Sequence, residues 1–418
     1  MCSDSLVRAT MLGMTSEFVS LIDIEDARKR LQGVSVRTPL DRSRSLSHHV
    51  DGPVFIKCEN LQRTGSFKIR GAYNRICRLD DSVKEKGVVA ASAGNHAQGV
   101  ALAATLNDIP SRVYMPEAAS LPKVEATKRY GADVVLTGKD FGAAFEAAME
   151  DTKKTGATFV HPFDHEHVIA GQGTIGLEIV EQMDEIGTIV VPIGGGGLIS
   201  GVASAVKQLR PGARVVGVQA KGAASFPDSL EKGTPVALAE MSTIADGIAA
   251  NSPGDLTLAH VDKFVDEVKC VSDETIAQAL VFAAERMKLV LEPAGAAGIA
   301  GILDDEGTLE PPVVVVLSGG NIDPLLLLSV MRFGLSAAGR YFAFHTQIKD
   351  EPGALHQLLG LIAEVGANIV GVEHHREGVR AVDLQNVEVA LQVETKGPQH
   401  IGELSDHLKK AGYVVRPL

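Results

Sequence analysis

The chain has 418 residues, of which 45% are hydrophobic and 22% are charged, a composition typical of a folded globular protein with two or three domains. Its net charge of −12 argues against nucleic acid as a partner, because phosphate contacts require a basic face. No apolar run approaches the roughly 18 residues that a membrane span requires, so we expect no membrane partner.

The N-terminus and the cysteines predict a cytoplasmic protein. Residues 1–20 lack a continuous apolar stretch, so we expect a flexible leader there rather than a signal peptide. The four cysteines form neither a CxxC pair nor a zinc spacing, and reduced thiols are typical of the cytosol. These cysteines are Cys2, Cys58, Cys77 and Cys270.

The middle of the chain alternates short Val- and Ile-rich runs with helix-like stretches. The expected strands are residues 88–91, 112–115, 132–138, 188–194, 214–220 and 313–317. The expected helical stretches are residues 98–107, 120–130, 140–154, 198–209 and 324–333. Continuous apolar runs joined by helical crossovers predict an open α/β architecture with buried parallel strands. A ligand of such a fold should lie beyond the carboxyl ends of the strands.

The pattern changes after Gly339. The expected strands there are residues 341–348, 367–375, 386–394 and 413–416, with helices at 352–365 and 398–410. The order βαββαβ predicts a compact α+β domain with an antiparallel sheet and helices on one face. We therefore expect a catalytic domain over residues 21–335, with a mobile small subdomain at about 68–165, and a separate domain over 339–418.

The segment SFKIRGA, residues 66–72, places Lys68 between apolar residues. Such a lysine is usually a surface residue whose stem packs on apolar neighbours. A partly desolvated lysine amine is also a nucleophile, however, and can form an imine with an aldehyde cofactor.

The segment SAGNHAQG, residues 92–99, lies between an expected strand and an expected helix. Backbone N–H groups at a helix N-terminus bind anions such as a carboxylate, and the amide of Asn95 can donate to a ring oxygen. A turn that only connects and caps the two elements is the alternative.

Two further glycine turns follow expected strands. GGGG at residues 194–197 can wrap a phosphate ester, but it lacks the pattern of a dinucleotide site or a P-loop. SGGN at residues 318–321 places Ser318 where its hydroxyl could bond a ring nitrogen. A structural glycine turn and a capping serine are the alternatives.

Together the four motifs supply the groups that a pyridoxal phosphate site requires. These are a nucleophilic amine, an anion-binding turn, a phosphate-binding glycine turn and a partner for the ring nitrogen. The order and spacing of these four motifs resemble those of the threonine dehydratase and serine racemase family, within the fold type II pyridoxal-phosphate enzymes. The resemblance covers roughly residues 20–335.

The resemblance implies a role for each matching side chain. Lys68 would hold pyridoxal 5′-phosphate as an imine and exchange protons with the substrate, and Ser92 would be a second catalytic residue. Phe67 would pack beside the ring, Asn95 would bond its 3-oxygen, and Ser318 would face its nitrogen.

Backbone contacts complete the implied site. The phosphate would lie in the turn formed by Gly194, Gly195, Gly196 and Gly197, and Gly247 would contact the cofactor. The substrate carboxylate would be bound by the loop Ser92, Ala93, Gly94, Asn95 and His96.

The implied activity is the dehydration and deamination of L-threonine, and of L-serine, to 2-oxobutanoate or pyruvate and ammonia, in isoleucine biosynthesis. A serine racemase, a hydroxyaspartate ammonia-lyase and a non-catalytic amino-acid sensor are the alternatives. Lys68 argues against the sensor, which needs no imine. Ala93 argues against the racemase, because resembling racemases carry a proton-donating serine there and a methyl group cannot move a proton. We expect a homodimer or a homotetramer.

We expect no metal site. Metal-binding relatives place acidic ligands in a segment where this chain has Gln219 and Ser225, and divalent cations prefer carboxylate oxygens. His161, His165 and His167 have no standard ligand spacing, which favours a solvated loop. Glu292 could be a ligand, a substrate-facing acid or a support for the N-terminus of a helix.

Residues 339–418 resemble an ACT domain, chiefly in IKDEPGALHQLL and GANIVGVEHH. The resemblance implies that a small amino acid binds near Asp350, Gly353 and Asn368. Inhibition by isoleucine is the regulatory hypothesis, and a purely oligomerising domain is the alternative.

Overall fold

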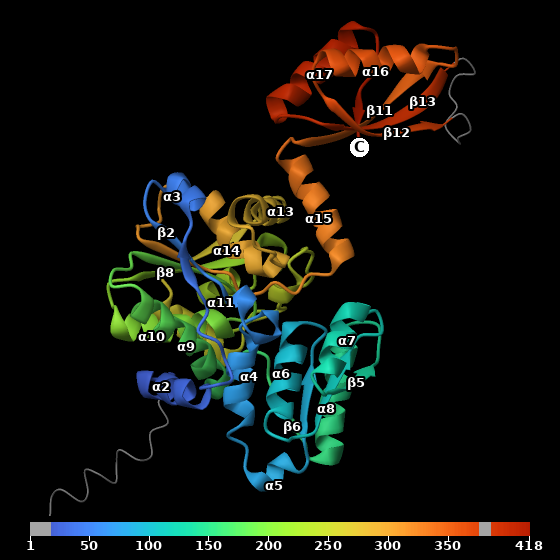
Figure 1. The fold of residues 1–418 in the computed structure, drawn as a ribbon. Coiled ribbons are helices and arrows are strands. Elements are labelled where there is room, and N and C mark those ends of the chain that lie inside the picture. Colours follow the sequence, from blue (N-terminus) through green and yellow to red (C-terminus); the bar gives the residue numbers. More distant parts are fainter. Residues whose placement is uncertain (1–17, 376–385) are drawn as a thin grey trace, which may run out of the picture. The chain divides into compact units, whose positions relative to one another are not determined.

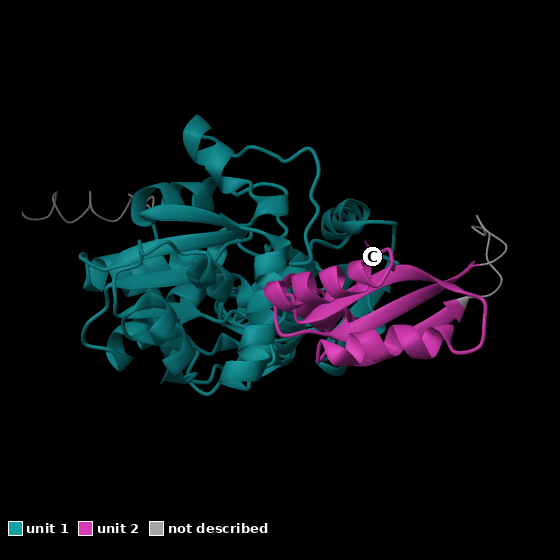
Figure 2. Cartoon of the chain, turned by 90° about the horizontal axis from the view of Figure 1, so that it is seen from above, with its two compact units in different colours: residues 1–324 teal, residues 325–418 magenta. Residues whose placement is uncertain are grey.

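The computed structural model describes residues 18–375 and 386–418. The chain divides into two compact units, Met1–Pro324 and Leu325–Leu418 (Figure 2). The division falls at the start of helix α15 (Pro324–Ala337), so this helix belongs to the second unit. From the sequence, we placed the boundary after this helix, between residues 335 and 339.

The first unit contains a six-stranded sheet in the order β1-β2-β10-β7-β8-β9, in which every pair except β1–β2 is parallel. Its strands are β1 (Leu40–Arg42), β2 (Val54–Lys57), β7 (Thr188–Pro192), β8 (Arg214–Ala220), β9 (Glu267–Val271) and β10 (Val313–Val316). The central strands β7 and β10 are buried at every position, as parallel strands covered on both faces require.

Helices cover both faces of this sheet. They include α9 (Glu166–Gln182), α10 (Gly197–Leu209) and α14 (Pro293–Leu303) (Figure 1). On β8, a Cβ at Gly217 would touch Ile199 of α10, whereas the next residue, Val218, contacts Gly301 of α14. Because successive strand residues face opposite sides, α10 and α14 lie on opposite faces.

A second, four-stranded parallel sheet of the first unit has the order β5-β4-β3-β6. Its strands are β3 (Val88–Ala91), β4 (Ser111–Met115), β5 (Asp133–Leu136) and β6 (Thr158–Phe159). Its helices are α4 (Lys68–Ile76), α6 (Asn95–Thr105), α7 (Leu121–Arg129) and α8 (Phe141–Thr155). The two sheets confirm the predicted fold class, but α6 begins at Asn95 rather than at 98 because the preceding turn is short.

The remaining elements of the first unit connect or flank the two sheets. The helices are α2 (Leu21–Arg30), α3 (Arg44–Val50), α5 (Asp81–Lys84), α11 (Phe226–Lys232), α12 (Asp255–Phe264) and α13 (Asp273–Phe282). The single turns are η1 (Glu59–Leu61), η2 (Arg63–Gly65), η3 (Lys221–Ala223), η4 (Asp246–Ile248) and η5 (Ala283–Met287).

Residues 18–20, the end of the expected flexible leader, are packed against the rest of the first unit. The backbone N–H of buried Val19 donates to Nε2 of His260 over 3.0 Å. The Phe18 ring packs edge-on against the same imidazole, and Ser20 caps α2. The other seventeen residues of the expected leader lie outside the described part of the chain.

The second unit, after α15, has the predicted order βαββαβ. Its elements are β11 (Tyr341–Lys349), α16 (Ala354–Glu364), β12 (Asn368–His375), β13 (Asn386–Glu394), α17 (Pro398–Lys410) and β14 (Arg416–Pro417). The antiparallel sheet has the order β12-β13-β11-β14, and both helices lie on one face (Figure 1).

Two details of the second unit differ from the sequence expectation. The last strand is Arg416–Pro417 rather than residues 413–416, because Tyr413 and Val415 pack against the core before the chain pairs with β11. Helix α16 begins after Pro352, because Gly353 adopts a left-handed conformation with φ of 93° and caps it.

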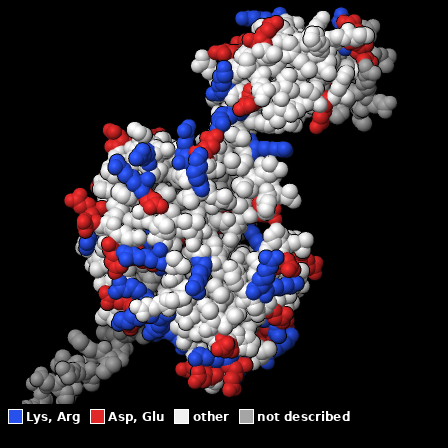
Figure 3. All heavy atoms as spheres, viewed as in Figure 1, with Lys and Arg blue, Asp and Glu red and all other residues white. Residues whose placement is uncertain are grey.

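The charges on the surface and the hydropathy of the helices are two further features of the fold. On the face shown in Figure 3, Lys and Arg side chains are interspersed with Asp and Glu over most of the surface. Among the described residues, no helix combines the length and the hydropathy that a membrane crossing requires.

Candidate active site

The four sequence motifs meet in the first unit, where strands of both parallel sheets end. The loop at Ser92 follows β3, the tetraglycine turn follows β7, and Ser318 follows β10. Ser66 forms an isolated bridge with Gly319, and the N–H of Phe67 donates to the Ser318 carbonyl over 3.3 Å. These contacts place the start of α4, and therefore Lys68, beside the end of β10.

Lys68 is the first residue of α4 and is half-buried. Its Nζ donates to the Pro162 carbonyl over 3.0 Å and lies 5.1 Å from the centroid of the Phe67 ring. Removal from water lowers the pKa of this amine to about 8, and the nearby Glu292 opposes that shift. A fraction of the amine is therefore neutral, and nucleophilic, near neutral pH.

Helix α6 packs closely on α4, so that Asn95 approaches the same region. A Cβ at Gly99 would come within 3.0 Å of the Lys68 backbone carbon, so this close packing requires glycine. The Asn95 amide donates to Glu292 Oε1 over 2.5 Å, and its carbonyl oxygen accepts from Asn321 over 2.8 Å. Asn95 is thus fixed from two sides.

The tetraglycine turn opens the long helix α10 without a side-chain cap. Gly196 has a φ of 95°, which side chains rarely adopt, and a Cβ there would lie 2.7 Å from the Phe226 ring. A Cβ at Gly195 would lie 2.3 Å from the ring of Phe163. An uncapped helix N-terminus made of glycines leaves backbone N–H groups for an anion such as a phosphate.

Ser318 is buried at the end of β10, and its hydroxyl lies 3.4 Å from the Ala294 carbonyl. That contact is long for a hydroxyl donor, so the hydroxyl is only weakly engaged there. Gly247 lies close by in η4, where a Cβ would come 2.9 Å from the Ala294 side chain. The structure therefore brings these two sequence-predicted residues together.

The loop after β3 is a short turn that leads directly into α6. The Ser92 hydroxyl accepts from the Gly94 N–H over 3.2 Å, which stabilises the turn. Ala93 packs against an apolar cluster that includes Val113. The His96 side chain is buried, and its Nε2 lies 2.8 Å from the Val160 carbonyl oxygen. Burial lowers the pKa of this imidazole to about 3. A substrate could therefore reach the backbone of His96 rather than its imidazole.

The segment after β6 is a part of the site that the sequence motifs missed. Pro162 accepts from Lys68, and Phe163 covers the tetraglycine turn. The Asp164 carboxylate accepts from the Thr257 N–H over 3.0 Å, at the start of α12. The sequence HPFD after a short strand carries no general signal for this role.

The three clustered histidines do not lie in a solvated loop as expected. All three are half-buried. Nδ1 of His161 accepts the N–H of Asp164 over 2.7 Å, and Nδ1 of His165 accepts the N–H of His167 over 3.1 Å. Burial lowers the pKa values of His165 and His167 to about 4. The imidazoles of His161 and His165 therefore accept hydrogen bonds from backbone N–H groups.

Gln219 lies in the segment where metal-binding relatives place acidic ligands. Its side-chain amide contacts the backbone of that segment. Its Oε1 accepts from the Phe226 N–H over 3.0 Å, and its Nε2 lies 3.4 Å from the Ala223 carbonyl. Within residues 18–375 and 386–418, no cluster of three His, Cys, Asp or Glu side chains has an arrangement suited to a metal ion.

Glu292 is buried at the start of α14, and its carboxylate does not cap that helix. The carboxylate makes no capping hydrogen bond to that helix and instead accepts from the amide of Asn95. Burial, and then the nearby Asp246, raise its pKa to about 7, while the hydrogen bond from Asn95 lowers it.

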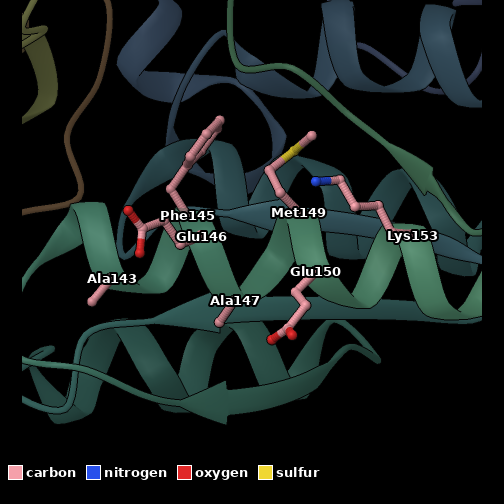
Figure 4. Close-up of a pocket in the computed structure, with 7 residues that line it drawn as sticks. All are labelled: Ala143, Phe145, Glu146, Ala147, Met149, Glu150 and Lys153. Atoms are coloured by element: carbon pink, nitrogen blue, oxygen red, sulfur yellow. The ribbon is translucent and has the colours of Figure 1, made fainter.

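A shallow hollow elsewhere is formed by a single helix, α8 (Figure 4). Its lining residues are Ala143, Phe145, Glu146, Ala147, Met149, Glu150 and Lys153. Because one helix surface cannot enclose a ligand, this hollow is not a candidate active site.

The three proposed effector residues lie in the second unit and are exposed. Asp350 and Gly353 belong to the turn between β11 and α16, and Asn368 begins β12. The Asn368 amide lies 3.4 Å from the Glu394 carboxylate.

The residues of the first unit fit pyridoxal phosphate. Lys68 offers an amine of lowered pKa, and the uncapped glycine turn offers N–H groups for the phosphate. The buried hydroxyls of Ser66 and Thr64, which have no hydrogen-bond partner among the described residues, lie in the segment just before Lys68.

Comparisons with known proteins agree with this fit. The family model described as "Pyridoxal-phosphate dependent enzyme" matches residues 32–319. The chain is 46% identical to the L-threonine ammonia-lyase of Thermotoga maritima, over 95% of this chain and 99% of that protein.

Solved structures give the same result. A processed threonine deaminase isoform 2 of Solanum lycopersicum is 38% identical with a TM-score of 0.72, covering 75% of this chain and 92% of that one. Maize serine racemase is 40% identical with a TM-score of 0.71, covering 76% and 98%. The chain therefore belongs to the family of pyridoxal-phosphate dependent enzymes.

Proposed function

We propose that this chain is an L-threonine ammonia-lyase, which converts L-threonine to 2-oxobutanoate and ammonia and L-serine to pyruvate and ammonia. The observation that carries the proposal is the position of Lys68, an amine of lowered pKa beside Asn95, Ser318 and an uncapped glycine turn. The similarity to an L-threonine ammonia-lyase over nearly the whole chain supports this substrate.

Each residue of the site has a defined task in this reaction. Pyridoxal phosphate, when bound, supplies an aldehyde for the substrate amine and a ring that withdraws electrons from its α-carbon. The Lys68 amine would hold the cofactor and then accept the α-proton of the substrate. The N–H groups of the turn at 194–197 would bind the phosphate, and those of the loop at 92–96 the substrate carboxylate.

The neutral hydroxyl of Ser318 would face the ring nitrogen and stabilise a proton there less than a carboxylate would. Loss of the α-proton and the β-hydroxyl together removes one water from threonine. Hydrolysis of the dehydrated amino acid then releases ammonia and 2-oxobutanoate.

The racemase alternative is opposed by Ala93. Its methyl group packs among apolar side chains of α6 and β4, and it offers no proton to the face opposite Lys68. The similarity to maize serine racemase is one of overall sequence and fold, and it does not by itself favour racemisation over elimination.

A test of the proposed function combines spectroscopy with a substrate panel. The purified protein should show the visible absorbance of a lysine–cofactor imine and release ammonia and a 2-oxo acid from threonine. Lys68→Ala should abolish both signals, whereas Lys154→Ala, at an exposed residue of α8, should change neither. Absence of the imine band from the unmodified protein, even after incubation with pyridoxal phosphate, would contradict the proposal.

We also propose that the reaction serves isoleucine biosynthesis and that the second unit binds isoleucine as an inhibitor. The βαββαβ order and an exposed turn at the start of α16 support an amino-acid-binding unit. A cytoplasmic location and a homodimeric or homotetrameric assembly stay predictions. The cysteines in the described part of the chain, Cys58, Cys77 and Cys270, carry free thiols, which is consistent with such a location.

A further inference from the structure

Glu292 is a buried carboxyl group that none of the four motifs contains. It lies at the start of α14 with only 4% of its surface exposed. A Cβ at Gly319 would come within 2.2 Å of Glu292 Oε1, so the carboxylate lies directly on the backbone of the turn that follows β10. The position therefore links α14, the Ser318 turn and α6.

The contacts of Asn95 show what this carboxylate does. One N–H of the Asn95 amide donates to Glu292 Oε1 over 2.5 Å. The amide oxygen accepts from Asn321, whose own amide also donates to the Thr64 carbonyl over 2.5 Å. With the oxygen and one N–H engaged, the plane of the amide is fixed, and one N–H remains for another acceptor.

We propose that Glu292 is a positioning residue of the reaction, which holds the amide of Asn95 so that its second N–H meets the ring oxygen of the cofactor. The inference rests on the proposed function, because it requires pyridoxal phosphate at Lys68. Glu292 acts through Asn95 and need not touch the substrate.

Charged groups from three elements face this carboxyl group. Lys68 of α4, Asp246 of η4 and Lys123 of α7 act on it, and Lys123 and Asp246 form an ion pair at 2.7 Å. Burial and Asp246 raise the pKa of Glu292 to about 7. Above that pH the ionised carboxylate accepts strongly from Asn95, and below it the protonated group accepts weakly. The cofactor environment should therefore change with pH near 7.

The experiment uses the holoenzyme and four variants: Glu292→Gln, Asn95→Ala, the double variant, and Glu150→Gln as an exposed control on α8. Cofactor absorbance is recorded from pH 5 to 9, the cofactor dissociation constant is measured, and kcat and KM for threonine are determined. Because Glu292→Gln is close in size and buries no new charge, it tests the role without opening a cavity.

The expected result has three parts. The unmodified enzyme and Glu150→Gln show an absorbance transition near pH 7, and Glu292→Gln lacks it. Glu292→Gln raises the cofactor dissociation constant about tenfold and lowers kcat about tenfold, as expected for the loss of one hydrogen bond to a charged group. The KM for threonine changes less than about threefold. In the Asn95→Ala background, Glu292→Gln has no further effect.

Additive effects of Glu292→Gln and Asn95→Ala would overturn the proposal, and so would a transition that is absent from the unmodified enzyme or persists in Glu292→Gln. These outcomes are distinguishable from failure of the proposed function. In that case the unmodified enzyme itself would lack the cofactor band or release no 2-oxobutanoate from threonine.

Discussion

At the scale of single residues, the site depends on how burial changes the chemistry of ordinary side chains. Lys68 is one of many lysines, but its removal from water lowers the pKa of its amine to about 8. Ser318 is buried, and in the proposed function its hydroxyl would be a neutral partner where a carboxylate would act as a stronger electrostatic group. Small changes at such positions should therefore alter the reaction more than the fold.

The first prediction concerns cofactor uptake by the apoenzyme. Only the neutral amine attacks an aldehyde, and the lowered pKa makes the neutral form dominant above about pH 8. The uptake rate should rise about tenfold per pH unit below pH 8 and then level off. Stopped-flow absorbance of the imine measures this rate. A rise that continues to about pH 10, where an ordinary lysine titrates, would contradict the assignment.

A second prediction concerns Ala93. Replacing it by serine places a hydroxyl in the loop at the position where resembling racemases carry a proton donor. Ala93→Ser should form D-serine from L-serine at a rate at least about tenfold above the unmodified enzyme, because reprotonation from the second face gains an acid. Chiral chromatography measures D-serine alongside pyruvate release. Equal D-serine formation in both proteins would show that the hydroxyl does not reach the α-carbon.

At the scale of elements, a buried ion network connects the segments that carry Lys68. Arg70, two residues further along α4, donates to Glu59 over 2.9 Å and to Glu178 of α9 over 2.7 Å. Lys57 of β2 donates to Glu178 over 2.6 Å. The two cations and two carboxylates balance in charge, so burial is tolerable only while every member keeps its partner.

The third prediction follows from that balance. Glu178→Ala leaves Lys57 without its carboxylate and Arg70 with one carboxylate, and should lower the free energy of unfolding by about 3–5 kcal/mol. Glu150→Ala, which breaks an exposed pair with Lys154, should change it by less than about 1 kcal/mol. Denaturant titration of both variants gives the comparison. Similar losses in the two variants would mean that the buried network contributes no more than a surface pair.

At the scale of the whole molecule, the chain consists of two compact units, and the residues of the candidate active site all lie in the first. The solved structures of threonine deaminase and serine racemase described above each match about three quarters of this chain, and nearly the whole of their own. The L-threonine ammonia-lyase of Thermotoga maritima, by contrast, matches 95% of this chain, so its similarity extends into the second unit.

The fourth prediction is an isoleucine response that depends on the second unit. Isoleucine should raise the threonine concentration needed for half-maximal rate about 5- to 150-fold, and threonine should weaken isoleucine binding by the same factor. Asn368→Ala should reduce this response, and deletion of residues 339–418 should abolish it, both without loss of basal activity. Rate measurements over a matrix of both amino acids test this. No response in the intact protein, or an unchanged response after the deletion, would count against an effector site.

The sequence by itself determined most of the secondary structure and the residues of the candidate active site. Continuous Val and Ile runs predicted β7, β8 and β10, because parallel strands covered on both faces are rich in apolar residues. Lys68 and the tetraglycine turn were identifiable because nucleophilicity and backbone freedom belong to the residue types themselves. The βαββαβ order of the second unit followed from local periodicity in the same way.

Only the tertiary structure decided which distant groups meet. Glu292 bonds Asn95 across 197 positions of the chain, and Lys68 meets Pro162 across 94. The sequence expectation of solvated histidines failed because burial and backbone partners arise from packing, which no local pattern encodes. The lowered pKa of Lys68 and the raised pKa of Glu292 have the same origin, since desolvation is a property of the assembled fold.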